Sequence, residues 1–369
     1  MRIAVLGVGL IGGSIGLAAR GRAGAEVCGY DPDPAVRARA LELGALDSET
    51  AELADAVRGA AAVFVAAPVG ALQRTVAEAL AAAGPDCVVS DVGSTKRVLA
   101  EASADERFIG GHPLAGAETE GVEHAREDLF EGARWYLTPA RESTAGVLYE
   151  RLHALLRRFG AHPAAIDAAT HDRLMANISH LPHVLANLLA AQAAGLLGSE
   201  GGAGGEGSEG RDGERPAPVG PSLRDAIRVA GANSSIWTDI YTTNADALLA
   251  AIDELSGRLG EVRAMLEAGD AGAVERWIER ARLDRDALLG TGSAGAAMQE
   301  LRVLVPNRPG VIAQIALALG EGRVNIGDLA LSPSRDNSQG VVSLWIGGEG
   351  QAARAGELVA GLGFTVVRA

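Results

Sequence analysis

In the first 165 residues, short apolar runs alternate with longer helical stretches rich in alanine and leucine. This alternation predicts a parallel β-sheet wound with helices. The expected strands are residues 3–6, 26–30, 62–67, 87–90, 108–109 and 135–137. Several of these strands end in loops rich in Pro, Gly, Ser or His. We expect ligands to bind there, because ligands of open α/β sheets bind at the carboxyl ends of the strands.

From about residue 167 to residue 289 the pattern changes to a long helical periodicity with hardly a strand signal. Residues 198–221 interrupt it with a Gly-rich segment that lacks apolar side chains to bury, so we expect a flexible insertion. The sequence therefore predicts a first domain at 1–166 and an all-helical second domain at 167–290. By analogy with other dehydrogenases, such a helical domain completes the active-site cleft and forms a dimer interface.

After a Gly/Ser/Ala linker, residues 298–369 form a third pattern. A strand at 299–305, a helix at 311–319, strands at 324–331 and 340–346, a helix at 351–362 and a strand at 365–367 are expected. This βαββαβ order is typical of the ferredoxin-like arrangement.

Composition narrows the candidate partners. The chain of 369 residues carries a net charge of −14, which argues against nucleic acid or an anionic membrane as the main partner. An anionic substrate would need a locally basic pocket. Both cysteines, Cys28 and Cys87, fall inside predicted strands, so we expect core residues rather than a disulfide or a metal pair. Neither a signal peptide nor a membrane-spanning run is recognised, and we expect a cytoplasmic protein.

The N-terminal strand runs directly into Gly7-x-Gly9-x-x-Gly12, and an apolar helix follows. In such a motif Gly7 permits a tight turn, Gly9 leaves room for a pyrophosphate, and Gly12 lets helix and strand pack closely. Asp31 ends the second strand, where an acid binds the adenine ribose and disfavours a 2′-phosphate. The order of strand, glycines, helix, strand and acid predicts dinucleotide binding, with a Gly-rich turn in another α/β domain as the alternative. Asp31 favours NAD over NADP. The expected cofactor-binding residues are Gly7, Gly9, Leu10, Ile11, Gly12, Asp31 and Pro68.

Two segments, 91–96 (DVGSTK) and 110–121 (GGHPLAGAETEG), follow strands near the nicotinamide half of the expected cofactor site. His112 is flanked by glycines and Pro113, a setting for an exposed, rigidly aimed imidazole rather than a core one, and a merely solvated or structural residue is the alternative. Imidazole accepts a hydroxyl proton near neutral pH. Ser94 could hydrogen-bond His112 or a substrate hydroxyl, or cap the helix at 96–100. Lys96 is a candidate structural residue.

The helical part adds further candidates. The run SHLPH at 179–183 places His180 and His183 on one helix face. We expect one of these imidazoles to point into the cleft and the other to pack against neighbouring side chains. No third ligand motif accompanies them, so we predict no metal. Arg228 sits among apolar helical positions, where it is either a structural ion-pair partner or the guanidinium that binds a substrate carboxylate. Trp237 is expected in the core.

Together the segments GVGLIGGSIG, DVGSTK, GGHPLAGAETEG, SHLPH and RDAIRVAGANSSIWTDI resemble the prephenate dehydrogenases, the NAD-dependent enzymes of tyrosine biosynthesis. The resemblance covers residues 1–290 and implies a Rossmann-type first domain. The last seventy residues resemble an ACT domain, a small regulatory module. Its ligand-binding positions correspond to Asn307, Gly310, Val311, Asn325 and Ile326.

The resemblance implies that hydride leaves C4 of prephenate for NAD⁺ while the ring carboxylate departs as CO₂. His112 would accept the C4 hydroxyl proton, with Ser94 orienting the pair. Arg228 would bind the ring carboxylate, and the substrate would be held by Ser179, His180 and His183. A homodimer and tyrosine as effector are also implied. The alternatives are an arogenate (cyclohexadienyl) dehydrogenase and a non-catalytic nucleotide or amino-acid sensor. The run GANSSIW after Arg228 departs from the Lys-Ser-Asp-Pro-like run of many relatives.

Overall fold

The computed structural model describes residues 1–116, 119–139, 146–200, 219–289, 298–306, 308, 311–324, 326–333 and 339–368. The chain divides into two compact units, Met1–Gly257 and Arg258–Ala369. This division falls inside helix α11 (Ala245–Glu267). The domain bounds expected from the sequence, 1–166, 167–290 and 298–369, stay predictions.

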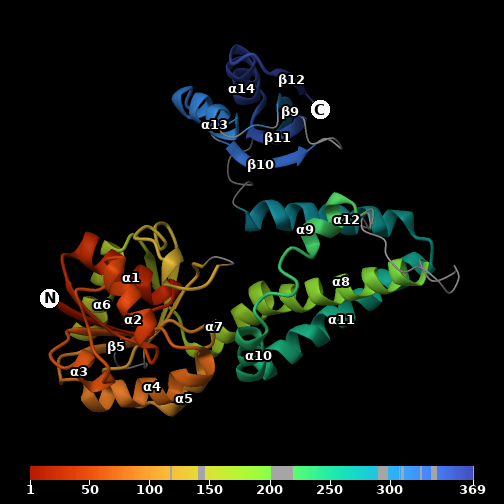
Figure 1. The fold of residues 1–369 in the computed structure, drawn as a ribbon. Helices are drawn as coiled ribbons and strands as arrows, with labels where there is room; N and C mark the ends of the chain where they lie inside the picture. Colours follow the sequence, from red (N-terminus) through yellow and green to blue (C-terminus); the bar gives the residue numbers. More distant parts are fainter. Residues whose placement is uncertain are drawn as a thin grey trace, which may run out of the picture. The chain divides into compact units, whose positions relative to one another are not determined.

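The first unit begins with a five-stranded parallel sheet in the order β3-β2-β1-β4-β5. Its strands are β1 (Arg2–Leu6), β2 (Glu26–Tyr30), β3 (Ser48–Glu49), β4 (Ala62–Val65) and β5 (Val88–Asp91). The connecting helices are α1 (Leu10–Ala23), α2 (Pro34–Glu42), α3 (Leu53–Val57), α4 (Val69–Ala82) and α5 (Arg97–Ala102), drawn in red to orange in Figure 1. The predicted parallel sheet is confirmed.

Both faces of this sheet are buried. Alternate residues of β1 enter different cores: Ile3 and Val5 pack with α1 and with α6 (Val147–Arg158), whereas Ala4 and Leu6 pack with α3 and α4. This alternation follows from the two-residue period of a strand. Cys28 and Cys87 are buried and free, which confirms them as core residues.

A second sheet contains β6 (Gly110–Pro113), β7 (Arg134–Thr138) and β8 (His162–Ala165), with a 3₁₀ turn at Val122–His124 between β6 and β7. β6 is antiparallel to β7, and β7 is parallel to β8. The strand expected at 108–109 is wrong in position, because Phe108 forms only a bridge to Val89 and the strand starts at Gly110. His112 therefore lies in a strand rather than in a loop. The sequence does not predict β3 and β8, because neither is an apolar run.

The helical part of the first unit starts with α7 (Ala168–Met175), which passes through a π-helical turn, Ala176–His180, into α8 (Leu181–Glu200). α9 (Pro221–Ala226), α10 (Ser234–Thr243) and α11 follow. The π turn, α8 and α11 share a small apolar core, which includes Ala176, Leu181 and Leu248. Because α8 extends to Glu200, the predicted insertion at 198–221 begins too early; residues 201–218 lie outside the described residues.

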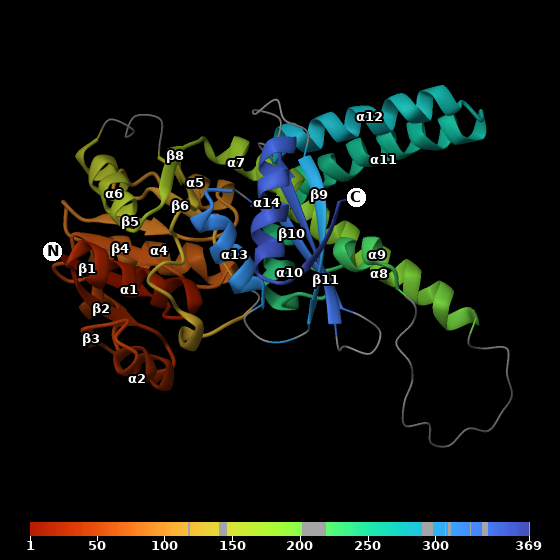
Figure 2. The same cartoon turned by 90° about the horizontal axis from the view of Figure 1, so that it is seen from above.

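In the second unit, the end of α11 and α12 (Ala271–Leu288) run side by side (Figure 2). The chain continues through β9 (Met298–Pro306), α13 (Val311–Glu321), β10 (Ile326–Pro333), β11 (Gln339–Gly347), α14 (Glu349–Gly361) and β12 (Thr365–Arg368). The sheet order is β10-β11-β9-β12, with antiparallel neighbours. α13 and α14 pack together on it (Figure 1). The βαββαβ order is as predicted. No helix in the described ranges is long and apolar enough to cross a bilayer.

Candidate active site

The glycine motif forms a cradle between β1 and α1. Gly7 has a φ of +92°, and its N–H donates to the Tyr30 carbonyl at 2.8 Å. A Cβ on Gly12 would lie 1.9 Å from the Gly7 oxygen, so only glycine permits this close packing of helix and strand. At Gly9 a Cβ would meet nothing within 4 Å. The geometry at Gly7 and Gly12 matches the tight turn and the close packing expected of the motif, and the role of Gly9 towards a pyrophosphate stays a prediction.

The cradle opens onto the N-terminus of α1. No side chain caps this helix, whose first turn contains Leu10 and Ile11. Its first N–H groups need an external partner, and a phosphate is the usual one. A Cβ on Gly7 would lie 2.5 Å from the Ala66 oxygen, so the cradle adjoins the chain that leads into Pro68, the exposed residue before α4.

The carboxylate of Asp31 borders the same cradle. One of its oxygens accepts the Val8 N–H at 2.9 Å, and the other accepts the Asp33 N–H at 3.0 Å. These bonds hold the acid at the end of β2, beside the glycine loop. The open space at Gly9, the helix terminus and this acid fit a dinucleotide.

His112 lies past the carboxyl end of β5, at the edge of the sheet where the cradle also lies. It pairs with Tyr136 of β7 in the antiparallel register, and the preceding N–H, of Gly111, donates to Asp91 Oδ1 at 3.0 Å. The half-buried imidazole places Nδ1 2.9 Å from Nε2 of His171. Burial, together with the neighbouring His171 and Lys96, holds the pKa of His112 well below its usual value. The ring is therefore neutral near pH 7 and able to accept a proton.

The partner of His112 begins a chain of polar contacts. His171 is fully buried, and its Nδ1 lies 2.8 Å from Asp172 Oδ1. The two oxygens of Asp172 also accept the backbone N–H groups of Lys96, at 2.8 Å, and Arg97, at 2.9 Å. Asp172 of α7 thus caps the N-terminus of α5 from across the structure.

His171, not Ser94, is the side chain that contacts His112, and the expected hydrogen bond of Ser94 to a substrate hydroxyl stays a prediction. Within the described ranges Ser94 forms no hydrogen bond with His112, and the cap position of α5 is Lys96. The sequence analysis missed His171 and Asp172, because a His-Asp pair in the first turns of a helix carries no local signal of its distant partners.

Lys96 and Asp91 form an ion pair that is completely buried. Burial lowers the pKa of the Lys96 amine, although the adjacent carboxylate of Asp91 opposes this effect. Asp91 Oδ2, the oxygen that pairs with Lys96, also accepts the Gly93 N–H at 2.8 Å, while Oδ1 accepts the Gly111 N–H of β6. The pair therefore holds the 91–96 segment against β6, in keeping with the structural role expected for Lys96.

Both histidines of the SHLPH run are buried. His183 stacks face to face on Trp237 with ring centroids 3.6 Å apart, and its Nδ1 hydrogen-bonds the Tyr241 hydroxyl. Its Nε2 is buried without a hydrogen-bond partner in the described part of the chain. His180 Nδ1 lies 3.2 Å from the Asn244 amide, and burial lowers its pKa to about 4. The expected core residue Trp237 is half-buried against His183.

The π turn explains the placement of this run. Pro182 has no N–H to donate to a carbonyl four residues back, and the Leu181 N–H donates to Ala176, five residues back. Ser179 lies half-buried in the same turn. Among the described residues no group of three or more His, Cys, Asp or Glu side chains is arranged to hold a metal ion.

Arg228 lies in an exposed turn after α9, and its expected place on a helix is wrong. The short helix ends at Ala226 and turns towards Gly231, which has a φ of +72°. The Gly231 N–H donates at 3.0 Å to Asn187 on α8, one turn beyond His183. The structure thus brings the turn that contains Arg228 next to the helix that contains the SHLPH run.

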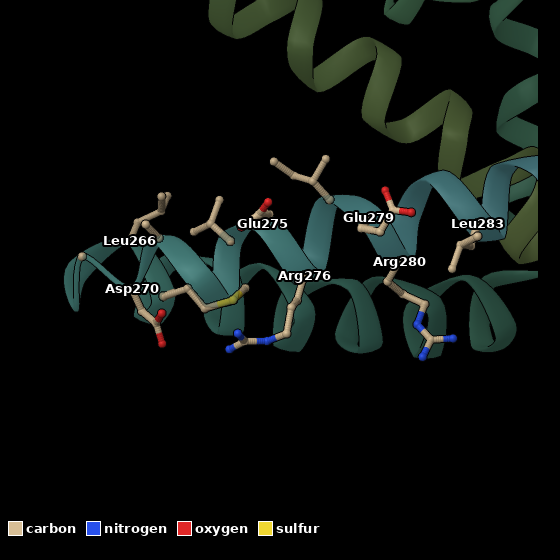
Figure 3. A pocket seen from close by; sticks show the side chains of 12 residues that line it. Leu266, Asp270, Glu275, Arg276, Glu279, Arg280 and Leu283 are labelled. Atoms are coloured by element: carbon tan, nitrogen blue, oxygen red, sulfur yellow. The ribbon is translucent and has the colours of Figure 1, made fainter.

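In the second unit, Val311 is buried at the start of α13 and Ile326 is half-buried at the start of β10. The other expected regulatory positions, Asn307, Gly310 and Asn325, lie outside the described residues. A groove between the end of α11 and α12 is lined by apolar side chains such as Leu266 and Leu283, with Arg276 and Arg280 on one side (Figure 3). It contains none of the predicted site residues.

A parallel sheet with a phosphate cradle, and a neutral imidazole at the same edge, define a nucleotide-dependent oxidoreductase. Comparison with known proteins identifies the family. The family model for the prephenate dehydrogenase nucleotide-binding domain matches residues 15–164, and the one for the prephenate dehydrogenase dimerization domain matches 167–280. The prephenate dehydrogenase of Bacillus subtilis (strain 168) is 31% identical over 368 residues, which cover 97% of this chain and 95% of the relative.

Solved structures share the fold. The arogenate dehydrogenase of Synechocystis matches with a TM-score of 0.67 and 27% identity, over 78% of this chain and all of that one. The prephenate dehydrogenase of A. aeolicus, solved with hydroxyphenyl propionate and NAD⁺, gives 0.67 and 23%, over 78% of this chain and 98% of that one. The chain belongs to the prephenate dehydrogenase family.

Proposed function

We propose that this dehydrogenase converts prephenate to 4-hydroxyphenylpyruvate and CO₂ with NAD⁺ as oxidant. NAD⁺, when bound, supplies the acceptor for the hydride that leaves C4. The observation that supports the proposal most strongly is the neutral, half-buried imidazole of His112 beyond the carboxyl end of β5. A neutral imidazole at this edge can accept the proton of a substrate hydroxyl.

In this proposal His112 takes up the C4 hydroxyl proton while C4 loses its hydride. The carbon–carbon bond to the ring carboxylate then breaks, and its electron pair completes the aromatic ring as CO₂ leaves. The proton returns to the oxygen, because the product is a phenol. The reaction therefore needs a group that is neutral before the step, accepts the proton during it and returns it afterwards.

Substrate carboxylates need cationic partners in a chain with a net charge of −14. We propose that the exposed Arg228 guanidinium, in the turn held next to α8, binds the ring carboxylate, since its planar fork matches a carboxylate. His183, whose Nε2 has no hydrogen-bond partner among the described residues, is the proposed hydrogen-bond partner of the substrate side chain, supported by Ser179 and His180 from the adjoining π turn.

Asp31 supports NAD over NADP as the cofactor. Its carboxylate is held beside the glycine loop by two backbone N–H groups. A 2′-phosphate at that position would face a negative charge, whereas ribose hydroxyls would donate to it.

Arogenate is the second candidate substrate, because the similar Synechocystis protein is an arogenate dehydrogenase. Arogenate carries an amino group where prephenate has a keto group. We would measure NADH or NADPH formation with each substrate and each cofactor, side by side. The highest kcat/KM is expected for prephenate with NAD⁺; a preference for arogenate, or for NADP⁺, would overturn the corresponding part of the proposal.

We also propose a homodimer formed through the helical part. Large apolar side chains are exposed on α8, α11 and α12, among them Leu188, Leu266 and Ile278, which are 60%, 64% and 57% exposed. A second copy of the chain would cover them. Light scattering during gel filtration is expected to give twice the chain mass; a monomeric mass would contradict this assignment.

The C-terminal βαββαβ module is proposed to be an ACT domain that binds tyrosine as a feedback effector. Its predicted ligand positions include the first residues of α13 and β10, Val311 and Ile326. Deleting residues 291–369 should leave an active dehydrogenase that tyrosine no longer inhibits. If the truncated enzyme kept the inhibition, the effector site would lie elsewhere.

A further inference from the structure

We propose that His171 and Asp172 are positioning residues that hold His112 in the tautomer with an unprotonated Nε2. This inference rests on the proposed function, because it explains how His112 is prepared to accept the substrate proton. It is carried by three contacts that join β6, α7 and the N-terminus of α5.

The first contact determines the proton on His171. Asp172 is ionised: burial opposes its charge, but hydrogen bonds from His171 and from the N–H groups of Arg97 and Lys96 outweigh that effect and lower its pKa. A carboxylate offers only acceptors. Since His171 Nδ1 lies 2.8 Å from Asp172 Oδ1, that nitrogen must carry the hydrogen.

The second contact determines the tautomer of His112. With its only hydrogen on Nδ1, the His171 ring has a lone pair on Nε2. This Nε2 lies 2.9 Å from His112 Nδ1, so His112 must donate there. The neutral ring of His112 then carries its only hydrogen on Nδ1, and Nε2 is left as an acceptor. The opposite tautomer would present an N–H to the substrate hydroxyl and could not take its proton.

The third contact makes the arrangement rigid. The Asp172 oxygens accept the N–H groups of Lys96 and Arg97, which belong to the start of α5. His171 is fully buried, and the ring of Tyr136 packs edge-on against it, with ring centroids 5.8 Å apart. Neither ring can turn over without breaking a buried hydrogen bond. The logic is that of the aspartate in a serine protease triad, which holds the histidine in one tautomer.

A matched pair of variants separates this role from simple packing. In His171→Gln the side-chain oxygen occupies the approximate position of Nε2 and can still accept from His112. In His171→Asn the amide retains the donor to Asp172 but does not reach His112. We expect kcat with prephenate to fall about 10- to 100-fold in His171→Asn and by much less in His171→Gln, with KM for prephenate and Kd for NAD⁺ close to wild type.

The control is His153→Asn, which removes an imidazole on α6 that faces Tyr149. It should retain the wild-type kcat. Equal losses in His171→Asn and His171→Gln, or a loss in neither, would overturn the positioning role. Wild-type protein is assayed first: a wild type that does not oxidise prephenate would refute the proposed function instead.

The tautomer can also be observed directly in the wild-type protein. Histidine-selective ¹⁵N labelling distinguishes protonated from unprotonated ring nitrogens at neutral pH. The signals of His112 are those that disappear in His112→Asn. We expect Nδ1 of His112 to be protonated and Nε2 unprotonated. A hydrogen on Nε2 would overturn the inference whatever the kinetics show.

Discussion

Two glycines of the cradle, Gly9 and Gly12, should respond to alanine in opposite ways. A Cβ on Gly12 would lie 1.9 Å from the Gly7 oxygen, so α1 must move away from β1 by about 1 Å or more. Overpacking of this kind costs about 1–3 kcal/mol, and the better helix propensity of alanine recovers only about 1 kcal/mol. The obstacle is backbone, which cannot rotate aside. The cost therefore lies at the upper end of that range, about 3 kcal/mol, and after the recovery Gly12→Ala should lose about 2 kcal/mol, which lowers Tm by roughly 4–8 °C.

At Gly9 the Cβ meets open space, and φ is −81°, which alanine adopts without strain. Gly9→Ala should keep Tm within about 3 °C of wild type. The methyl group would instead displace a phosphate from the N–H groups of α1. Loss of a charged hydrogen bond weakens binding of NAD⁺ by about 10- to 100-fold. Thermal unfolding and NAD⁺ titration on both variants test this. A wild-type Tm in Gly12→Ala, or wild-type NAD⁺ affinity in Gly9→Ala, would refute the steric reasoning.

Three further predictions concern the site. His112→Asn should lower kcat by a factor of about 10² or more with NAD⁺ affinity near normal, since only the proton acceptor is lost; wild-type turnover would remove His112 from the mechanism. Arg228→Ala should chiefly raise KM for prephenate, because a carboxylate partner is lost; an effect on kcat alone would contradict the pairing. Burial lowers the pKa of His180 from 6.5 to about 4. The unfolded chain therefore binds a proton that the folded one does not, and stability is lost as pH falls from about 6.5 to 4, by roughly 3 kcal/mol. Urea unfolding of wild type and His180→Gln across this range should show a smaller loss in the variant; parallel curves would refute it.

Local patterns in the sequence determined much of the fold. The alternation of apolar strands and helices predicted the parallel sheet, and the last seventy residues predicted the βαββαβ order. The cradle was also predictable, because the constraints on Gly7 and Gly12 act between neighbouring turns of one strand–helix unit. Such features depend on residues close in the chain, and their periodicity or backbone conformation is visible in the sequence.

The arrangement around His112 was decided by tertiary structure alone. His112 and His171 are 59 positions apart, and Lys96 is 76 positions from Asp172. No local pattern links them, since each contact exists only because β6, α5 and α7 meet at one edge of the sheet. Likewise, Arg228 reads as helical from its neighbours but lies in a turn, where Gly231 and Asn187 hold the backbone. The sequence thus supplied the imidazole, whereas the packing of distant elements chose the partner that controls its proton.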